Sequence, residues 1–342
     1  MPLDDPRYLR LERMLMRDVG GRLDVRGLAA AAWAAAVLNR PTLLSALLGH
    51  SAEQLRGASL HEHAVVAWAL GVLHLGRQQK LVLANIADGA AHRLATFDPK
   101  SLALRVLHDL SAPPGPVLTR NDAHQPLRQL SAVNPQSLTR LLSGFAACQH
   151  PPPRRFVALL GNEATRLLPL FDASTLAFLL AAHAKMGVQP HPRLLAAAPS
   201  ALASALLRDE GAPRAGALAV WAFARMRMHP GAPLLDAGDA VLGAVPGLSG
   251  VSTARLVGAV WGFGALSTRP AQCWPALSTA LASRDLRLED QRMLAVALAR
   301  LERDTGFHAK DAALWGALPP AAREAPLGRV IWLRCRPLAG AA

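Results

Sequence analysis

The chain has 342 residues, which is enough for two ordinary domains or for one elongated array. Hydrophobic residues make up 51% and are mostly alanine and leucine, whereas aromatic residues make up 5%, so the composition favours helices and disfavours a β-sheet fold. The 37 Lys+Arg against 24 Asp+Glu give a net charge of +13, which points to a polyanionic partner, in the first place nucleic acid. The alternative is that the arginine excess reflects only the base composition of a GC-rich gene.

The sequence gives no support for a disulfide-linked or zinc-binding protein, for a membrane-spanning protein or for a targeting peptide at its start. The cysteines (Cys148, Cys273 and Cys335) are odd in number and far apart, so they indicate neither a disulfide framework nor a zinc site. No apolar run reaches the roughly 18 residues that cross a bilayer. The first seven residues carry two acids and do not read as a targeting peptide, so any address was either removed or never present. We expect no membrane association, no metal and no cofactor.

The chain opens with an amphipathic segment and then repeats. In residues 8–18 the apolar side chains recur at helical spacing, so we expect residues 1–23 to form a helix that caps a repeat array. The apolar segment around Trp221 recurs forty residues later around Trp261. Eight anchor positions share this pattern at a mean spacing of about 38 residues. They are Trp33, Trp68, Leu107, Ser143, Ala181, Trp221, Trp261 and Leu298.

Each repeat reads as a start signal, a first helix, a break and a second helix. Asp98-Pro99 is such a start, with Asp as N-cap and Pro at the first helical position, and Asn134-Pro135 is nearly the same. We expect the first helix of repeat one to stop at Pro41 and that of repeat two at Gly76. The pattern predicts an all-α fold, a right-handed α-solenoid of about eight stacked helix pairs over residues 24–318, with a tail at 319–342. The third repeat, about 98–133, is the least regular.

These segments resemble the octotricopeptide repeat family. The similarity lies in the proline-rich run before Phe156, in the joints at 97–102, 134–138 and 171–176, and in the Trp-Ala-Phe-Ala type stretch. The resemblance covers residues 24–318 and implies an α-solenoid that binds RNA in mitochondria or chloroplasts. It also implies an alternative, a permanent structural subunit of an organellar ribosome that clamps rRNA and neighbouring proteins.

Two columns of side chains follow the anchors. The aromatic column (Trp33, Trp68, Phe145, Trp221, Phe223, Trp261 and Phe263) is surrounded by small apolar residues, so core packing is favoured over base stacking. Seven residues before the anchors stand Arg26, His61, Lys100, Gln136, Ser174, Arg214, Ala254 and Gln291, which we call the polar row. In modular RNA binders one or two side chains per repeat read a base, so the row predicts base recognition. The alternative is an ordinary solvated first turn.

Three basic neighbours of the polar row, Arg140, Arg255 and Arg292, are candidates for holding phosphates. The pair His61 and His63 lacks a third ligand at a suitable spacing and predicts no metal site. No nucleophile elbow, glycine-rich phosphate loop or paired carboxylates are present, so we expect a protein that is not an enzyme and has no small-molecule substrate. The expected partner is RNA, a single-stranded transcript or rRNA, and in the ribosomal alternative also ribosomal proteins.

Overall fold

The computed structural model describes residues 23–51, 53–96, 133–208, 212–245, 248, 250–307 and 313–319. These residues form helices and no strand, which confirms the predicted all-α class for this part of the chain. The chain divides into two compact units, residues 1–167 (unit 1) and 168–342 (unit 2), and each unit is described by itself. No described helix is both long and apolar enough to cross a membrane.

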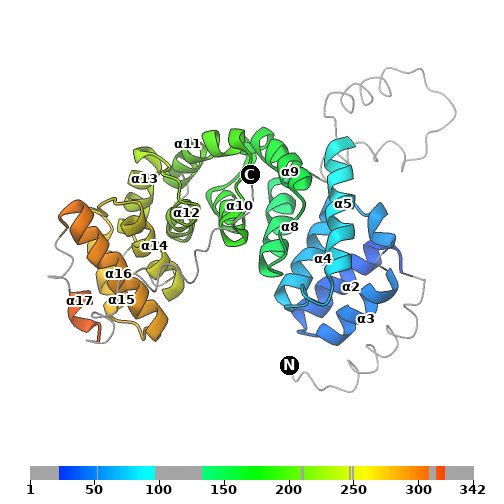
Figure 1. Ribbon diagram of the computed structural model, residues 1–342, viewed down its shortest axis with the longest axis horizontal. Helices are drawn as coiled ribbons and strands as arrows, with labels where there is room; N and C mark the ends of the chain where they lie inside the picture. The colour runs from blue at the N-terminus through cyan, green and yellow to red at the C-terminus, as the bar shows by residue number, and fades with distance from the viewer. Residues whose placement is uncertain are drawn as a thin grey trace. The chain divides into compact units, whose positions relative to one another are not determined.

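Most of the described helices form pairs, in which a short connection joins a first helix to a second helix (Figure 1). The first helices are α2 (Val25–Val37), α4 (Leu60–Val72), α8 (Pro135–Ala147), α10 (Ala173–Met186), α12 (Pro213–Arg225), α14 (Thr253–Ala265) and α16 (Leu288–Thr305). The second helices are α3 (Pro41–Ser51), α5 (Lys80–Thr96), α9 (Arg154–Arg166), α11 (Pro192–Arg208), α13 (Ala232–Gly243) and α15 (Trp274–Ala282). Three short helices complete the described chain, namely η1 (Gln54–Gly57), η2 (Leu168–Leu170) and α17 (Ala313–Ala317).

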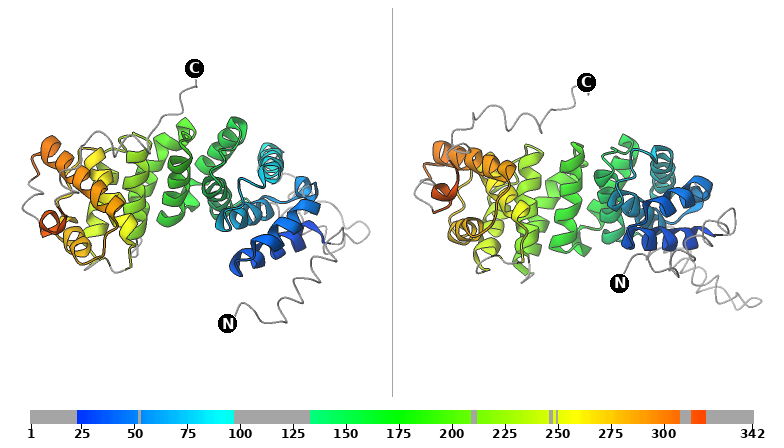
Figure 2. Two further views of the ribbon diagram at one scale, coloured as in Figure 1. Left: turned by 60° about the horizontal axis from the view of Figure 1, so that its bottom comes forward. Right: turned by 90° about the horizontal axis from the view of Figure 1, so that it is seen from below.

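The pairs of each unit stack in two layers. In unit 2, α10, α12, α14 and α16 pack side by side in one layer, and α11, α13 and α15 follow one another in a second (Figure 2). In unit 1, α4 packs against α2 and α8, while α5 packs against α9. Each layer buries the apolar face of the other, which a single helix pair of this size could not do for itself.

The starts of several first helices follow from their capping residues. The side chains of Asp24, Asn134 and Asp172 each accept a hydrogen bond from the backbone N–H three residues further on. Ser59 and Glu62 cap each other's backbone N–H at the start of α4. The start predicted at Asn134 is therefore confirmed, and Asp172 begins α10 in the same way.

The ends of the first helices share one turn, which the sequence did not reveal. The residue six positions after the anchor adopts a left-handed conformation, with φ between 51° and 67°, in six first helices. Its N–H bonds to the carbonyl three residues back, and the next N–H bonds to the carbonyl five residues back, which together make a Schellman motif. The residues in this position are Asn39, His74, Gln149, Gly187, Arg227 and Ser267.

This turn corrects two predicted helix ends. α2 ends at Val37, and Pro41 begins α3 instead of stopping the preceding helix. α4 ends at Val72, because His74 and not Gly76 takes the left-handed position. Gly76 is required for another reason, since a Cβ atom there would lie 2.3 Å from the Cβ of Cys148.

Glycines let neighbouring first helices approach closely and in register. A Cβ on Gly144 of α8 would lie 2.5 Å from the carbonyl carbon of Ala67 in α4. A Cβ on Gly262 of α14 would lie 2.8 Å from Cγ1 of Val220 in α12. A Cβ on Gly71, further along α4, would lie 2.7 Å from the Cβ of Ala147, further along α8, so these two helices run parallel. In unit 2, a Cβ on Gly264 of α14 would meet Ala297 of α16, and Ser267 just after α14 donates a hydrogen bond to Asp304 further along α16, which gives the same direction. The first helices of a unit therefore begin at one edge of their layer and end at the other.

The stack in unit 1 differs from the repeat count. Because α8 packs directly against α4, no helix pair separates them, although the sequence predicts one between Trp68 and Ser143. Most of that predicted third repeat, including Leu107 and Lys100, lies outside the described residues. So do nearly all of the predicted N-terminal cap, residues 1–23, and of the tail, residues 319–342.

The aromatic column splits into two faces. Phe145, Phe223 and Phe263 are fully buried between the layers, as predicted for core packing. The anchors lie two residues earlier, about 200° away around the helix, so they occupy the opposite face. Trp33 is 53% exposed, which makes its predicted core position wrong, and Trp221 is half-buried against Gly258 of α14.

Candidate nucleic-acid interface

The polar row takes shape most clearly in unit 1. Arg26, His61 and Gln136 are each the second residue of a first helix, in α2, α4 and α8, and all three are exposed. Because these helices lie side by side, the three side chains cross the face of the unit at one level. Arg140 is exposed one turn further along α8. Here the donors and acceptors that the sequence predicts for base recognition are brought together.

In unit 2 the polar row is partly used by the protein itself. Ser174 is half-buried at the second position of α10. Arg214, at the second position of α12, donates from Nε to the carbonyl oxygen of Gly250 at 2.5 Å. Gln291 donates from Nε2 to the carbonyl oxygen of Leu286 at 3.0 Å. These two side chains hold the backbone that precedes α14 and α16.

A half-exposed aromatic ring lies on the solvent-facing side of the first helices of unit 2. In each unit we call this side the first-helix face. The guanidinium carbon of Arg255 in α14 lies 5.4 Å from the ring centroid of Phe178 in α10, a cation–π contact. Phe178 remains 42% exposed, so part of the ring is open to solvent. Arg255 is therefore engaged with this ring, whereas Arg292, the third predicted phosphate ligand, is exposed on α16.

Two arginines form hydrogen bonds with the connections that precede first helices. Neither of them stands out in the sequence. Arg93 of α5 donates to the carbonyl oxygens of Ala58 and Gly57, at 3.2 and 2.7 Å. Arg284, just after α15, donates to those of Val251 and Leu248, at 2.6 and 2.9 Å. Part of the basic character of the chain thus stabilises its own fold.

The two histidines of the His61-x-His63 motif do not converge. His61 is exposed, whereas His63 is fully buried with Nε2 2.7 Å from the carbonyl oxygen of Leu55. Desolvation by burial lowers the pKa of His63 to about 4, so its ring is neutral near pH 7. Across the described ranges, no group of three or more His, Cys, Asp or Glu side chains is placed to hold a metal ion.

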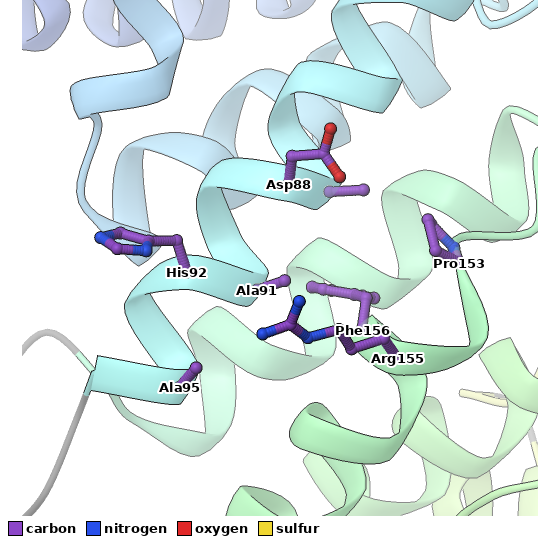
Figure 3. A pocket seen from close by; sticks show the side chains of 8 residues that line it. Asp88, Ala91, His92, Ala95, Pro153, Arg155 and Phe156 are labelled. Carbon is purple, nitrogen blue, oxygen red and sulfur yellow. The ribbon is translucent and has the colours of Figure 1, made fainter.

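A hollow of about 330 Å³ lies between α5 and α9 (Figure 3). Its floor consists of alanines of α5 together with Phe156, and its polar side chains are Asp88, His92 and Arg155. All three polar side chains are exposed. Small-molecule sites usually combine such a volume with buried polar groups that converge on the ligand, and this hollow has none.

The geometry defines a class, a helical protein built from recurring helix pairs with a polar and aromatic first-helix face. A scan of protein-family models finds no match to the chain. A search of curated proteins finds no match either.

Proposed function

We propose that the chain is an RNA-binding protein of organelles, built as a right-handed α-solenoid of about eight helix pairs. The first-helix face binds RNA, and the polar row contacts its bases. The observation that carries the proposal is the alignment of Arg26, His61 and Gln136 at one position of three neighbouring helices, all exposed. A recurring polar position on a stack of helices is the arrangement with which helical repeat proteins read bases.

Two further features support binding of single-stranded RNA. The exposed ring of Phe178, covered on one side by Arg255, and the exposed indole of Trp33 are flat apolar surfaces on the first-helix face. Unpaired bases stack on such rings, whereas paired bases in a duplex are not accessible to them. The net charge of +13 supplies the attraction to phosphates.

The location in a mitochondrion or chloroplast follows from the resemblance to octotricopeptide repeats. One observation favours the alternative, a structural subunit of an organellar ribosome. Trp33, Val37 and Val72 are 53%, 57% and 43% exposed on the neighbouring helices α2 and α4. Exposed apolar side chains on adjacent helices are typical of surfaces that contact other proteins.

The test is selection of RNAs from a random-sequence pool by the purified full chain. A variant with Arg26→Ala, His61→Ala, Gln136→Ala and Arg140→Ala removes the row of unit 1. We expect the wild type to enrich a common sequence and this variant to lose the preference. A control with Arg56→Ala and Arg166→Ala removes as many positive charges from unit 1 as the row variant does, namely two. This control should keep the sequence preference.

An absence of RNA binding by the wild type would refute the proposal. An unchanged preference in the row variant would refute base recognition by the row. The ribosomal alternative predicts that the protein co-sediments with ribosomal particles from organelle lysate and resists roughly 200 mM salt, because a subunit is held by many contacts.

A further inference from the structure

The connections within the helix pairs carry cations and no acids. In unit 2 the ranges 185–193, 225–233 and 265–274 contain Lys185, Arg193, Arg225, Arg227 and Arg269 but neither Asp nor Glu. In unit 1 the ranges 37–42, 72–82 and 147–157 contain Arg40, Arg77, Lys80, Arg154 and Arg155 and again no acid. We call these connections, within each unit, the connection edge.

The opposite edge, where second helices lead into the next first helix, has a balanced charge. Residues 284–292 hold three arginines and three acids, and residues 53–62 hold one arginine and two acids. Several cations of this edge are also occupied, since Arg93, Arg214 and Arg284 bond to backbone carbonyls. The excess positive charge of each unit is therefore concentrated at its connection edge.

The fold places these cations in a line. The first helices of a unit run parallel and in register, so their C-terminal ends lie along one side. Packed helices lie roughly 8–10 Å apart, so a basic connection recurs at about that interval. In unit 2 the side chains of Lys185, Arg193 and Arg269 are exposed, and Arg269 leans over the ring of Phe307.

Four acids lie toward this edge in unit 2: Asp236 in α13 is exposed, Glu302 in α16 is half-buried, and Asp239 and Asp304 are engaged. Asp239 is buried, and its carboxylate accepts hydrogen bonds from the backbone N–H groups of residues 271, 272 and 273. Asp304 accepts a hydrogen bond from Ser267 and is paired with Arg303 at 2.7 Å and Arg300 at 3.4 Å. Neither of these two engaged carboxylates cancels the charge of Lys185, Arg193 or Arg269.

We propose that the connection edge binds the ribose–phosphate backbone of RNA. The inference rests on the proposed function and assigns the two parts of the RNA to two surfaces. The polar row contacts the bases, and this edge contacts the phosphates. A line of evenly spaced cations fits a linear polyanion. A membrane surface would require exposed apolar side chains beside the cations, and the described connections of unit 2 expose no large one. Those of unit 1 do expose large apolar side chains, namely Val37, Leu38, Val72 and Leu81, so the proposal applies to the connection edge of unit 2. Contacts of this kind fix the register of the RNA without reading its sequence.

The test compares two double variants of the full chain, each of which removes two exposed positive charges from unit 2. The edge variant carries Lys185→Gln and Arg193→Gln, and the control carries Arg208→Gln and Arg287→Gln on the opposite edge. Binding to a fluorescent oligouridylate of about 20 nucleotides is measured between about 50 and 200 mM salt. Such a strand is longer than the roughly eight bases that one base per pair requires.

We expect the edge variant to reduce the slope of log K against log salt by about 1.4, since each phosphate contact on a single strand contributes about 0.7. The loss of affinity in the edge variant should therefore be about sevenfold larger at 50 mM than at 200 mM salt, and the control should stay close to wild type. Equal losses in both variants, or no loss in the edge variant, would overturn the inference. In either case the wild type still binds RNA, so the proposed function stands. If the wild type does not bind RNA, both fail.

Discussion

Two buried histidines should make the stability of this protein depend on pH. His183 in α10 and His63 in α4 have no exposed surface. Nδ1 of His183 lies 3.3 Å from the carbonyl oxygen of Val188, and Nε2 of His63 lies 2.7 Å from that of Leu55. The carbonyl only accepts, so the proton sits on the nitrogen that faces it. The other ring nitrogen is buried without a partner in both residues. Protonation would place an unpaired charge in the core.

The size of the effect follows from the pKa values. Desolvation by burial lowers the pKa of each histidine from 6.5 to about 4 in the folded state. A depressed pKa means that the unfolded chain binds protons first, so stability is complete above pH 6.5 and is lost as the pH falls toward 4. A pH of 5 lies about 1.5 units below the pKa of 6.5 in the unfolded state. Protonation at this pH therefore stabilises the unfolded state over the folded state by about 2 kcal/mol for each histidine. The pKa of Asp304 is lowered to about 2, chiefly by Arg303, so its titration falls below this window.

Other repeats supply the matched substitutions. The position of His183 holds Phe145, Phe223 and Phe263 in other first helices, and the position of His63 holds leucine in several of them. Urea unfolding of the wild type, of His183→Phe, of His63→Leu and of the double variant is followed by tryptophan fluorescence at pH 7.5 and pH 5. We expect the wild type to lose about 4 kcal/mol over this interval, each single variant about half, and the double variant little. A double variant as sensitive to pH as the wild type would refute the reasoning.

Three further predictions concern the stacking of the pairs. Gln149→Gly should raise the free energy of unfolding by about 1 kcal/mol in urea titrations, because glycine adopts the left-handed turn without a Cβ penalty; a decrease would contradict the assigned turn. Gly144→Ala should lower stability by about 1–3 kcal/mol, since its Cβ would clash with the Ala67 backbone. Gly49→Ala in α3, which meets nothing within 4 Å, is the control and should be neutral or mildly stabilising. Asp239→Ala should lower the thermal midpoint and cost about 3 kcal/mol, because three backbone N–H groups lose their buried acceptor; an unchanged midpoint would show that water replaces it.

The periodicity of the sequence predicted the helix pairs but not where the first helices end. Start signals are local, because a capping side chain such as that of Asn134 or Asp172 bonds to the backbone three residues away. The ends depend on a left-handed residue, and the usual signal is glycine. Gly187 after α10 and Gly306 after α16 follow that rule, while His74 and Gln149 do not, so Gly76 was misread as a terminator. Tertiary packing outweighs the local backbone preference at these turns.

The same limit applied to the aromatic column. Reading the tryptophans and phenylalanines as one set ignored that residues two apart point in nearly opposite directions on a helix. Phe223 is therefore buried between the layers, while Trp221 stands at the first-helix face. The pairing of Arg255 with Phe178 could not be read from the sequence, because it joins two helices that flank a third.

Net charge alone cannot place an interface, but the register of the helix pairs can. Once the left-handed turns after the first helices are located, at Asn39, His74, Gln149, Gly187, Arg227 and Ser267, the connections can be compared with one another. The sequence shows that these connections contain no acids. This becomes informative only because the structure places the connections of a unit along one edge. Arginines such as Arg93 and Arg284 show the converse, since their positions beside backbone carbonyls give them a structural role that a count of charges hides. The total of +13 therefore combines cations that hold the fold with cations that face solvent. Only the second group can release counterions from RNA, so the salt dependence of binding should report the exposed cations and not the net charge.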